Sequence, residues 1–337
     1  MSVALSVVIP VLNEAQNLDA LHRELTTALE STRQSYELIV VDDGSTDASF
    51  EVLRRLHEQD PRLRVIRFRR NYGQTAAFAA GIAAARGALI VTADGDGQND
   101  PADIPAMLTD IAAGADIVCG WRRERKDPFL TRRLPSLLAN KLISWATGVK
   151  LNDYGCSLKI FRAEAIKPVQ LRGEMHRFMP ALASELGVRI VERPVNHRAR
   201  QHGRSKYGLS RTVRVILDLL TVKFLLRYST QPLQIFGLIG GLMCLSGGAL
   251  LGYLGVMRIL GRVSINERMP ITLFGILLFF TGVQLVTLGL LAELQARTYH
   301  ETQGGPGYVV RETLGGGDGD QSSHGGTESA ETRRKGR

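Results

Sequence analysis

The sequence predicts an α/β fold, in which a mostly parallel sheet is covered by helices on both faces, together with a pair of long apolar helices. Short β-branched runs alternate with segments of helical periodicity from residue 3 onwards. This alternation is typical of parallel sheets, because each connection has to cross back over the sheet. Residues 233–257 and 271–292 contain no charged side chain. Each is long enough to cross a bilayer, which takes about 20 helical residues.

The strands and helices of the first part can be placed from these patterns. The expected strands are residues 3–11, 37–43, 64–68, 88–94 and 115–120. The expected helices are residues 17–31, 48–59, 75–87 and 101–114. Ligands bind beyond the carboxyl ends of the strands in such sheets, so the residues directly after each strand are the first candidates for function.

The charge is unevenly distributed along the chain. The 337 residues include 42 Lys and Arg against 33 Asp and Glu, a net charge of +9, and 44% are hydrophobic. This composition excludes a disordered chain and a transporter with many spans. Basic residues are concentrated at 198–227, before the first apolar segment, and are few between the two segments. The positive-inside rule therefore places both long ends in the cytoplasm.

Two interpretations of the basic stretch compete, nucleic-acid binding and attraction to anionic lipid. Its position beside an apolar segment favours lipid, and we expect no nucleic-acid partner. Residues 209–228 alternate basic and apolar positions at helical spacing, which predicts an amphipathic interfacial helix. We therefore expect four parts, a cytosolic domain (1–208), a juxtamembrane helix (209–230), a membrane hairpin (231–300) and a mostly disordered cytosolic tail (301–337).

The cysteines and the N-terminus agree with a reducing cytosol. The N-terminus lacks the basic leader of a signal peptide. Cys119, Cys156 and Cys244 form no CxxC pair, so neither a disulfide framework nor a zinc site is indicated. We expect Cys119 and Cys156 to be core thiols. His176 and His197 have no partner at a metal-ligand spacing.

Two acidic loops follow expected strands, DDGSTD at 42–47 and DGDGQ at 94–98. Each has a simple structural explanation, because Ser45 or Asp47 could cap the next helix and 94–98 could be a solvated turn. Two such loops at one sheet edge, however, converge on one crevice. Asp94 and Asp96 are spaced to share one Mg²⁺ or Mn²⁺ with substrate phosphates, and Asp43 could accept a hydrogen bond from a nucleobase. Because GxGxxG and Walker loops are absent, a nucleotide-diphosphate site is favoured over a dinucleotide site.

With PVLNE (10–14), GWRRERKD (120–127) and RQHGRSKY (200–207), these loops resemble a family 2, GT-A type glycosyltransferase. The resemblance covers residues 3 to about 312. It is strongest to the polyprenyl-phosphate branch, which includes dolichol-phosphate mannose synthase and the bacterial two-span enzymes that glycosylate undecaprenyl phosphate. It implies a GT-A catalytic domain and a divalent metal, Mg²⁺ or Mn²⁺.

The resemblance also implies a role for individual residues. It places the nucleoside near Pro10, Leu12, Glu14, Val41 and Asp43. The metal and diphosphate would lie on Asp94, Gly95, Asp96 and Gln98. Phosphates would be bound by Arg122, Arg200, Ser205 and Lys206, with Asp153 beside the reacting sugar as an orienting or weakly basic carboxylate.

Some of these residues have a simpler explanation. Arg200 and Lys206 could be lipid-surface charges, and the role of Arg125, Arg132 and Arg133 stays open between lipid-phosphate guidance and headgroup contact. Gly95 replaces the usual Ala and Asn99 the usual Asp or His, and neither change removes a ligand.

The activity implied by the resemblance is inverting sugar transfer from a nucleotide-sugar to polyprenyl phosphate at the cytoplasmic face of a bacterial inner membrane. UDP-glucose is the first expected donor, ahead of galactose-type and aminoarabinose-type sugars and of GDP-mannose. A homo-oligomer such as a tetramer is implied as well. A processive polysaccharide synthase is disfavoured because the QxxRW motif is missing, and a pyrophosphorylase because its Gly-rich loop is missing. An inactive scaffold is disfavoured by the intact DxD and RxxGxSK motifs.

Overall fold

The chain forms two compact units, residues 1–213 with 306–337, and residues 214–305. The structure is a computed structural model that describes residues 3–123, 140–141, 143–144, 147–171, 175–198, 232–261, 268–302 and 307–315. The expected amphipathic helix at 209–228 lies outside these ranges.

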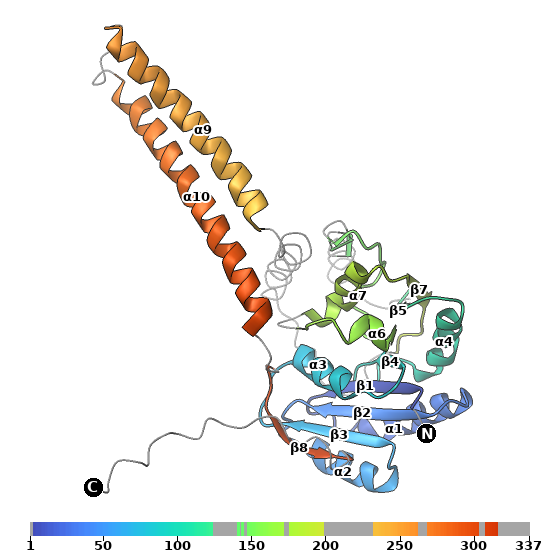
Figure 1. Cartoon of the computed structure of the whole chain (residues 1–337). Helices are drawn as coiled ribbons and strands as arrows, with labels where there is room; N and C mark the ends of the chain where they lie inside the picture. Colours follow the sequence, from blue (N-terminus) through green and yellow to red (C-terminus); the bar gives the residue numbers. More distant parts are fainter. Residues whose placement is uncertain are drawn as a thin grey trace, which may run out of the picture. The chain divides into compact units, whose positions relative to one another are not determined.

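The larger unit is built on an eight-stranded sheet of order β7-β5-β6-β4-β1-β2-β3-β8 (Figure 1). Strands β1, β2, β3 and β4 all run parallel to one another, whereas β6 and β8 run antiparallel to the strands with which they pair. The sheet is therefore mixed and mostly parallel, as expected. The strands are β1 Leu5–Val11, β2 Tyr36–Asp42, β3 Leu63–Phe68, β4 Leu89–Thr92, β5 Ile117–Trp121, β6 Lys159–Arg162, β7 Ile190–Pro194 and β8 Val310–Leu314.

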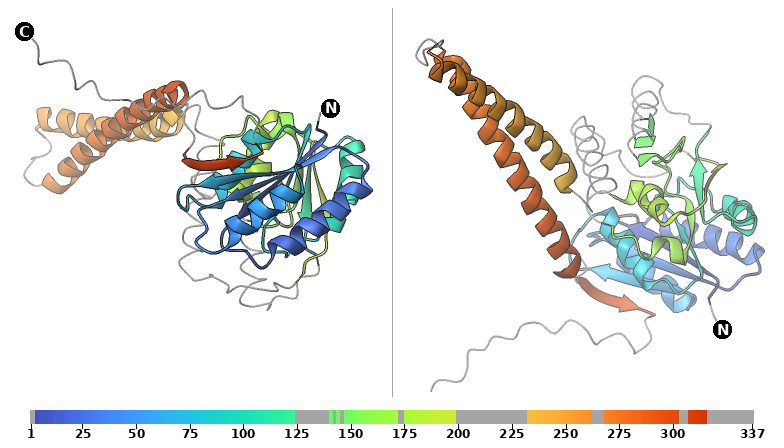
Figure 2. Two further views of the ribbon diagram at one scale, coloured as in Figure 1. Left: turned by 90° about the horizontal axis from the view of Figure 1, so that it is seen from below. Right: turned by 45° about the horizontal axis from the view of Figure 1, so that its top comes forward.

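Helices cover both faces of this sheet (Figure 2). One face packs against α1, α2 and α4, because alternate β1 residues such as Leu5 and Val7 point into one apolar core with their leucines. The other face packs against α3, where a Cβ on Gly81 would lie 2.2 Å from Val8 Cγ1. The helices are α1 Leu18–Ser31, α2 Ser49–Gln59, α3 Gln74–Ala84, α4 Ile104–Ala112, α6 Ala163–Ile166 and α7 Met179–Ala183, with 3-10 turns η1 Pro101–Asp103, η3 Met175–Phe178 and η4 Ser184–Leu186.

The register brings the functional segments to one edge of the sheet. Thr92, the last residue of β4, pairs with Lys159, the first residue of β6. Strand β5 lies on the other side of β6 and runs in the same direction as β4, with Cys119 paired to Lys159. The segments that follow β1, β2, β3, β4, β5 and β7 and the segment that precedes β6 therefore share the carboxyl edge of the sheet.

Strand β8 comes from the C-terminal segment, beyond the long apolar helices. It pairs antiparallel with β3 and covers what would otherwise be an open edge strand. The Tyr308 ring stacks on Phe68 at 4.8 Å, and Glu312 forms an ion pair with Arg54 at 3.3 Å. This strand was not expected from the sequence, and it lies in the segment expected to be mostly disordered. Residues 316–337 lie outside the described ranges.

The second unit contains α9 (Pro232–Ile259) and α10 (Met269–Thr302), which pack along each other. Residues 236–259 and 269–292 are long and apolar enough to cross a membrane. Only 17% of the most apolar stretch of α9 and 11% of that of α10 is buried. Most of these apolar side chains are therefore exposed, unlike those of a core helix in a soluble protein. The helices approach closely at Gly282, where a Cβ would lie 2.6 Å from the Gly240 carbonyl oxygen. Both expected spans lie within these helices.

Candidate active site

Asp94 and Asp96 lie on the loop directly after β4, at the carboxyl edge of the sheet. Both side chains are half-buried. Burial raises the pKa of Asp94, and the charge of Asp96 raises it further, while Arg122 and Lys159 lower it. The loop is closed by Asn99, whose Oδ1 accepts the Asp94 N–H at 3.0 Å. The loop thus holds two mutually repelling carboxylates close together, an arrangement that a cation would relieve.

A divalent metal fits this donor set. Asp94 and Asp96 offer hard carboxylate oxygens and Gln98 an amide oxygen, which are the ligands that Mg²⁺ and Mn²⁺ prefer. Within the described ranges, no group of three or more His, Cys, Asp or Glu side chains could hold a metal ion alone. An ion here would therefore take further ligands from substrate phosphates and water, which is the usual arrangement for Mg²⁺ at nucleotide sites.

Asp43 lies after β2 and is 3% exposed. Its two oxygens accept the backbone N–H groups of Tyr72 at 2.7 Å and Gly73 at 2.9 Å. Burial raises the pKa of Asp43, and these two donors oppose that rise. The carboxylate therefore holds the loop after β3, and a nucleobase would have to share its remaining lone pairs.

The loops after β1 and β2 interlock. Asn13, at φ 58°, accepts the Thr46 N–H on its side-chain oxygen at 2.8 Å and donates its own N–H to Ser45. Asp47 accepts the Ser49 N–H at 3.0 Å, but the N-cap residue of α2 is Ala48, which makes no side-chain cap, so Asp47 stabilises the turn before the helix and the prediction that it caps α2 is wrong. The acidic loop is thus structural as well as a candidate for binding.

The expected nucleoside residues lie around these loops. Pro10 pairs with Val41 in the sheet, and its carbonyl oxygen would lie 3.0 Å from a Cβ on Gly95. Leu12 and Glu14 are half-buried beyond the end of β1. Val41 is fully buried and faces α3, so its side chain lies inside the core and away from the loop surface.

Arg122 and Asp153 form a bidentate ion pair. Arg122 Nε lies 2.7 Å from Asp153 Oδ2 and Nη2 lies 3.0 Å from Oδ1. The Asp153 side chain is 2% exposed and the Arg122 side chain 18%. Asp153 also accepts the Gly155 N–H at 3.1 Å. The carboxylate expected beside the reacting sugar is thus enclosed, and it orients an arginine that is itself close enough to Asp94 to lower the pKa of that group.

Lys159 is a functional candidate that was not expected from the sequence. It is 1% exposed at the first position of β6, and its ammonium donates to the carbonyl oxygens of Cys156 and Tyr154. Its charge lies close enough to Asp94 to lower the pKa of that group. A lysine at the start of an apolar strand was the available signal.

The segment after β7 is tied to the acidic loop. The Arg198 N–H donates to the Gln98 carbonyl oxygen at 3.0 Å, and Asn99 and His197 form an isolated antiparallel β-bridge. Asn196 donates hydrogen bonds from its backbone and side-chain N–H groups to the Asp103 carboxylate. This segment leads directly to the expected phosphate-binding motif. Arg200, Ser205 and Lys206 themselves lie outside the described residues, as do Arg125, Arg132 and Arg133.

The two cysteines of the larger unit are core thiols, as expected. Cys119 and Cys156 are fully buried and free. Burial raises the pKa of Cys119 to about 12 and that of Cys156 to about 11, so both stay protonated.

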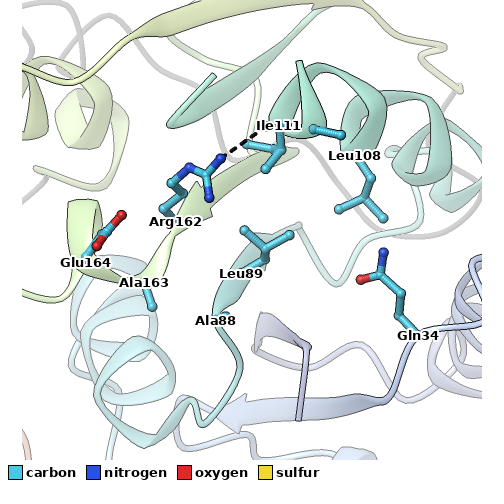
Figure 3. Close-up of a pocket in the computed structure, with 9 residues that line it drawn as sticks. Gln34, Ala88, Leu89, Leu108, Ile111, Arg162, Ala163 and Glu164 are labelled. Carbon is cyan, nitrogen blue, oxygen red and sulfur yellow. Dashed lines mark hydrogen bonds between the residues drawn. The ribbon is translucent and has the colours of Figure 1, made fainter. Parts of the chain in front are cut away.

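A cavity of about 530 Å³ lies elsewhere on this unit (Figure 3). It is lined by Leu89 at the start of β4 and by Arg162, which donates to the Ile111 carbonyl at 3.2 Å. Leu89 and Arg162 pair at the amino edge of the sheet, opposite Asp94. The cavity is therefore separate from the acidic loops.

Comparison with known proteins decides the family. Residues 6–169 match the model for "Glycosyl transferase family 2". The chain is 48% identical to a dodecaprenyl-phosphate galacturonate synthase from Rhizobium johnstonii, over 92% of this chain and 93% of the relative. It is 38% identical to an undecaprenyl-phosphate 4-deoxy-4-formamido-L-arabinose transferase from Edwardsiella ictaluri, over 92% and 94%. The chain belongs to glycosyl transferase family 2.

Solved structures agree on the fold of this glycosyltransferase. Mannosyl-3-phosphoglycerate synthase from Rubrobacter xylanophilus gives a TM-score of 0.53 at 16% identity, over 66% of this chain and 74% of the other. Glucosyl-3-phosphoglycerate synthase from Mycobacterium tuberculosis, in complex with Mn²⁺, UDP and phosphoglyceric acid, gives 0.53 at 19% identity, over 65% and 78%. At these identities the likeness shows the fold alone, which is the expected GT-A fold. With its two apolar helices, the glycosyltransferase is a membrane-associated protein.

Proposed function

We propose that this glycosyltransferase transfers a uronic acid of the galacturonate type from a UDP-sugar to a polyprenyl phosphate. The observation that carries the proposal is the 48% identity to the galacturonate synthase, because it extends over 92% of the chain. A likeness of that extent includes both the acidic loops of the catalytic unit and the two apolar helices.

The proposed sugar differs from the one expected from the sequence. Glucose came first there, but the two curated relatives described above act on galacturonate and on 4-deoxy-4-formamido-L-arabinose. We therefore replace glucose by a uronic acid, with the formamido-arabinose as the alternative at 38% identity. GDP-mannose finds no support in these two relatives. UDP is retained as the donor nucleotide from the family resemblance.

The geometry suits the transfer of a sugar from a donor diphosphate to an acceptor phosphate, two anionic groups that the site has to hold close together. Asp94 and Asp96, with Gln98, would hold Mg²⁺ or Mn²⁺, which supplies Lewis-acid stabilisation of the departing diphosphate. Arg122, oriented by Asp153, offers a fixed guanidinium for a phosphate. The acceptor phosphate would be bound by Arg200, Ser205 and Lys206. These residues follow, in the sequence, the segment that is hydrogen-bonded to Gln98.

The reaction itself needs little help from a general base. A lipid phosphate is already anionic near neutral pH, because its second pKa is about 6. One of its oxygens forms the new bond to the anomeric carbon as the bond from that carbon to the diphosphate oxygen breaks. This direct displacement inverts the anomeric configuration. The protein has to hold the two anions together and offset their repulsion.

The membrane arrangement follows from the acceptor. The phosphate of a polyprenyl phosphate lies in the headgroup layer, so the site has to be held near that layer. Helices α9 and α10 would cross the membrane, the interfacial helix at 209–228 would lie on it, and the catalytic unit and both termini would be cytoplasmic. The positive charge before α9 supports this orientation. A homo-oligomer such as a tetramer stays part of the proposal.

The test is transfer by the full chain purified in detergent. It is incubated with undecaprenyl phosphate and Mn²⁺ or Mg²⁺, with labelled UDP-galacturonate, UDP-glucuronate, UDP-glucose, UDP-linked 4-deoxy-4-formamido-L-arabinose or GDP-mannose. We expect a labelled lipid from UDP-galacturonate and its loss in Asp96→Asn. Transfer from the formamido-arabinose or another single donor would overturn the proposed sugar. Transfer from none of them would overturn the enzymatic proposal.

A further inference from the structure

Gln74, the first residue of α3, contacts the acidic loop from a neighbouring part of the sheet edge. Its Nε2 lies 2.6 Å from Asp94 Oδ1. An ionised carboxylate has no hydrogen to give, so the amide nitrogen is the donor. The side chain therefore reaches from the segment after β3 to the carboxylate that is the first candidate for the metal.

The start of α3 is held firmly on both sides of Gln74. Before it, Gly73 has φ 95° and gives its N–H to Asp43 at 2.9 Å. After it, Thr75 is buried and hydrogen-bonds His176 Nδ1 at 2.8 Å. The amide thus projects from a fixed backbone position, so the contact with Asp94 is built into the fold.

The chemistry of the donor matters as much as its position. Asp94 and Asp96 are two carboxylates on one loop, separated only by Gly95. An amide N–H stabilises and orients a carboxylate without cancelling its charge, whereas a lysine or arginine at this position would neutralise it and compete with a cation. A neutral donor is therefore the suitable partner for a carboxylate that has to bind a divalent ion.

We propose that Gln74 is a positioning residue that orients the Asp94 carboxylate for the divalent cation. The inference rests on the proposed function, because that function places the cation on Asp94. It also connects two loops, since Asp43 holds the backbone from which Gln74 extends to Asp94. The hydrogen bonds that fix the loop after β3 therefore also fix the residue that orients the Asp94 carboxylate.

Two variants separate this role from a purely structural one. Gln74→Met keeps the length of the side chain and removes the donor. Gln74→Lys keeps a donor and adds the charge that should compete with the cation. Gln34→Met is the matched control, because Gln34 is exposed and lies by the cavity at the opposite edge of the sheet (Figure 3).

The measurement is Mn²⁺ binding to the full chain in detergent with UDP present, followed by the free Mn²⁺ resonance. We expect about 10-fold weaker binding in Gln74→Met, because removing a partner of a metal ligand typically costs 10–100-fold. Gln74→Lys should bind Mn²⁺ still more weakly, and Gln34→Met should match wild type. In turnover assays the Mn²⁺ concentration for half-maximal rate should rise, with little change in kcat at saturating Mn²⁺.

The contrary results are equally clear. If Gln74→Met, folded by its melting temperature, binds Mn²⁺ within twofold of wild type, Gln74 does not position Asp94. If Gln74→Lys binds Mn²⁺ as well as wild type does, the argument from charge is wrong. If wild type binds no Mn²⁺ in the presence of UDP, the metal site of the proposed function fails, and this inference fails with it.

Discussion

Replacing Asp153 by Asn tests whether the Arg122–Asp153 pair carries the architecture of the site. The substitution keeps the shape and one acceptor, but it leaves the guanidinium without its counter-charge. Removing one partner of a buried ion pair costs about 3–5 kcal/mol. Arg122 retains 18% exposure, so we take the lower end, about 3 kcal/mol. For a unit of this size that corresponds to a melting temperature lower by about 6–12 °C.

The assay is chemical denaturation of the full chain in detergent, followed by tryptophan fluorescence. Trp121, one of the two tryptophans of the chain, precedes Arg122, so part of the signal reports on this part of the sheet. Asp19→Asn is the matched control, because its 2.6 Å pair with Arg55 is about half exposed on both sides and should contribute less than about 1 kcal/mol. Arg122→Met should be more destabilising than the double variant Arg122→Met/Asp153→Asn, which leaves no unpaired charge.

The same variant separates positioning from base catalysis. If Asp153 acts through Arg122, kcat/KM falls in Asp153→Asn while the pH–rate profile keeps its shape. If Asp153 is the weak base, the acid limb of the profile disappears. A stability within about 1 kcal/mol of wild type, or additive effects of the two single variants, would refute the ion-pair reasoning.

Further perturbations test other contacts of the catalytic unit. In Gly44→Ala, where Gly44 has φ +74°, the new Cβ would lie 2.5 Å from the Arg70 carbonyl carbon, so the loop held by Asp43 should shift and the KM for the donor should rise about tenfold, by analogy with other misplaced binding groups. Gly187→Ala is the control, because Gly187 has φ +73° and open space around it. An equal KM in the two variants would contradict this prediction. Tyr308→Ala removes the ring that stacks on Phe68, and we expect its free energy of unfolding to fall by about 1 kcal/mol beyond the effect of the lost apolar area. Tyr308→Phe keeps the ring and should keep this stabilisation. Equal denaturation midpoints for the two variants would count against the role of the C-terminal segment. Burial lowers the pKa of His176 to about 3, so the folded state keeps it neutral while the unfolded state takes up a proton below about pH 6.5. Its stabilising contribution is therefore complete above about pH 6.5 and falls by about 1.4 kcal/mol per pH unit as the pH drops towards 3, a slope that urea titrations should find reduced in His176→Gln.

Much of the central sheet could be predicted from local pattern. Strands β1 to β5 and helices α1 to α4 lie within a few residues of their expected positions, because the buried strands are short apolar runs, α1, α2 and α4 are amphipathic, and α3 is an apolar, Ala-rich helix. The acidic loops could be predicted too, since the carboxyl edge of a parallel sheet follows from strand direction alone. The same rule applied to the strand at 64–68 would have pointed to Gln74.

Other elements have no local signal of that kind. Strands β6 and β7 are short, and β8 is five residues between Gly-rich stretches. Each exists because a neighbouring strand offers unpaired backbone groups. Their formation depends on pairing partners far away in sequence, as the pairing of Val65 with Leu314 shows.

The sequence by itself determined the class of fold, the acidic carboxylates at the strand ends and the two membrane-length segments, because each is written in consecutive residues. Tertiary structure alone decided how those residues are used. It paired Arg122 with Asp153, enclosed Lys159 beneath the site, brought Gln74 to Asp94 and returned the C-terminal segment to the edge of the sheet. The physical reason is that a charge or an amide acquires its role from the partner it meets on burial, and that partner is chosen by strand order and register.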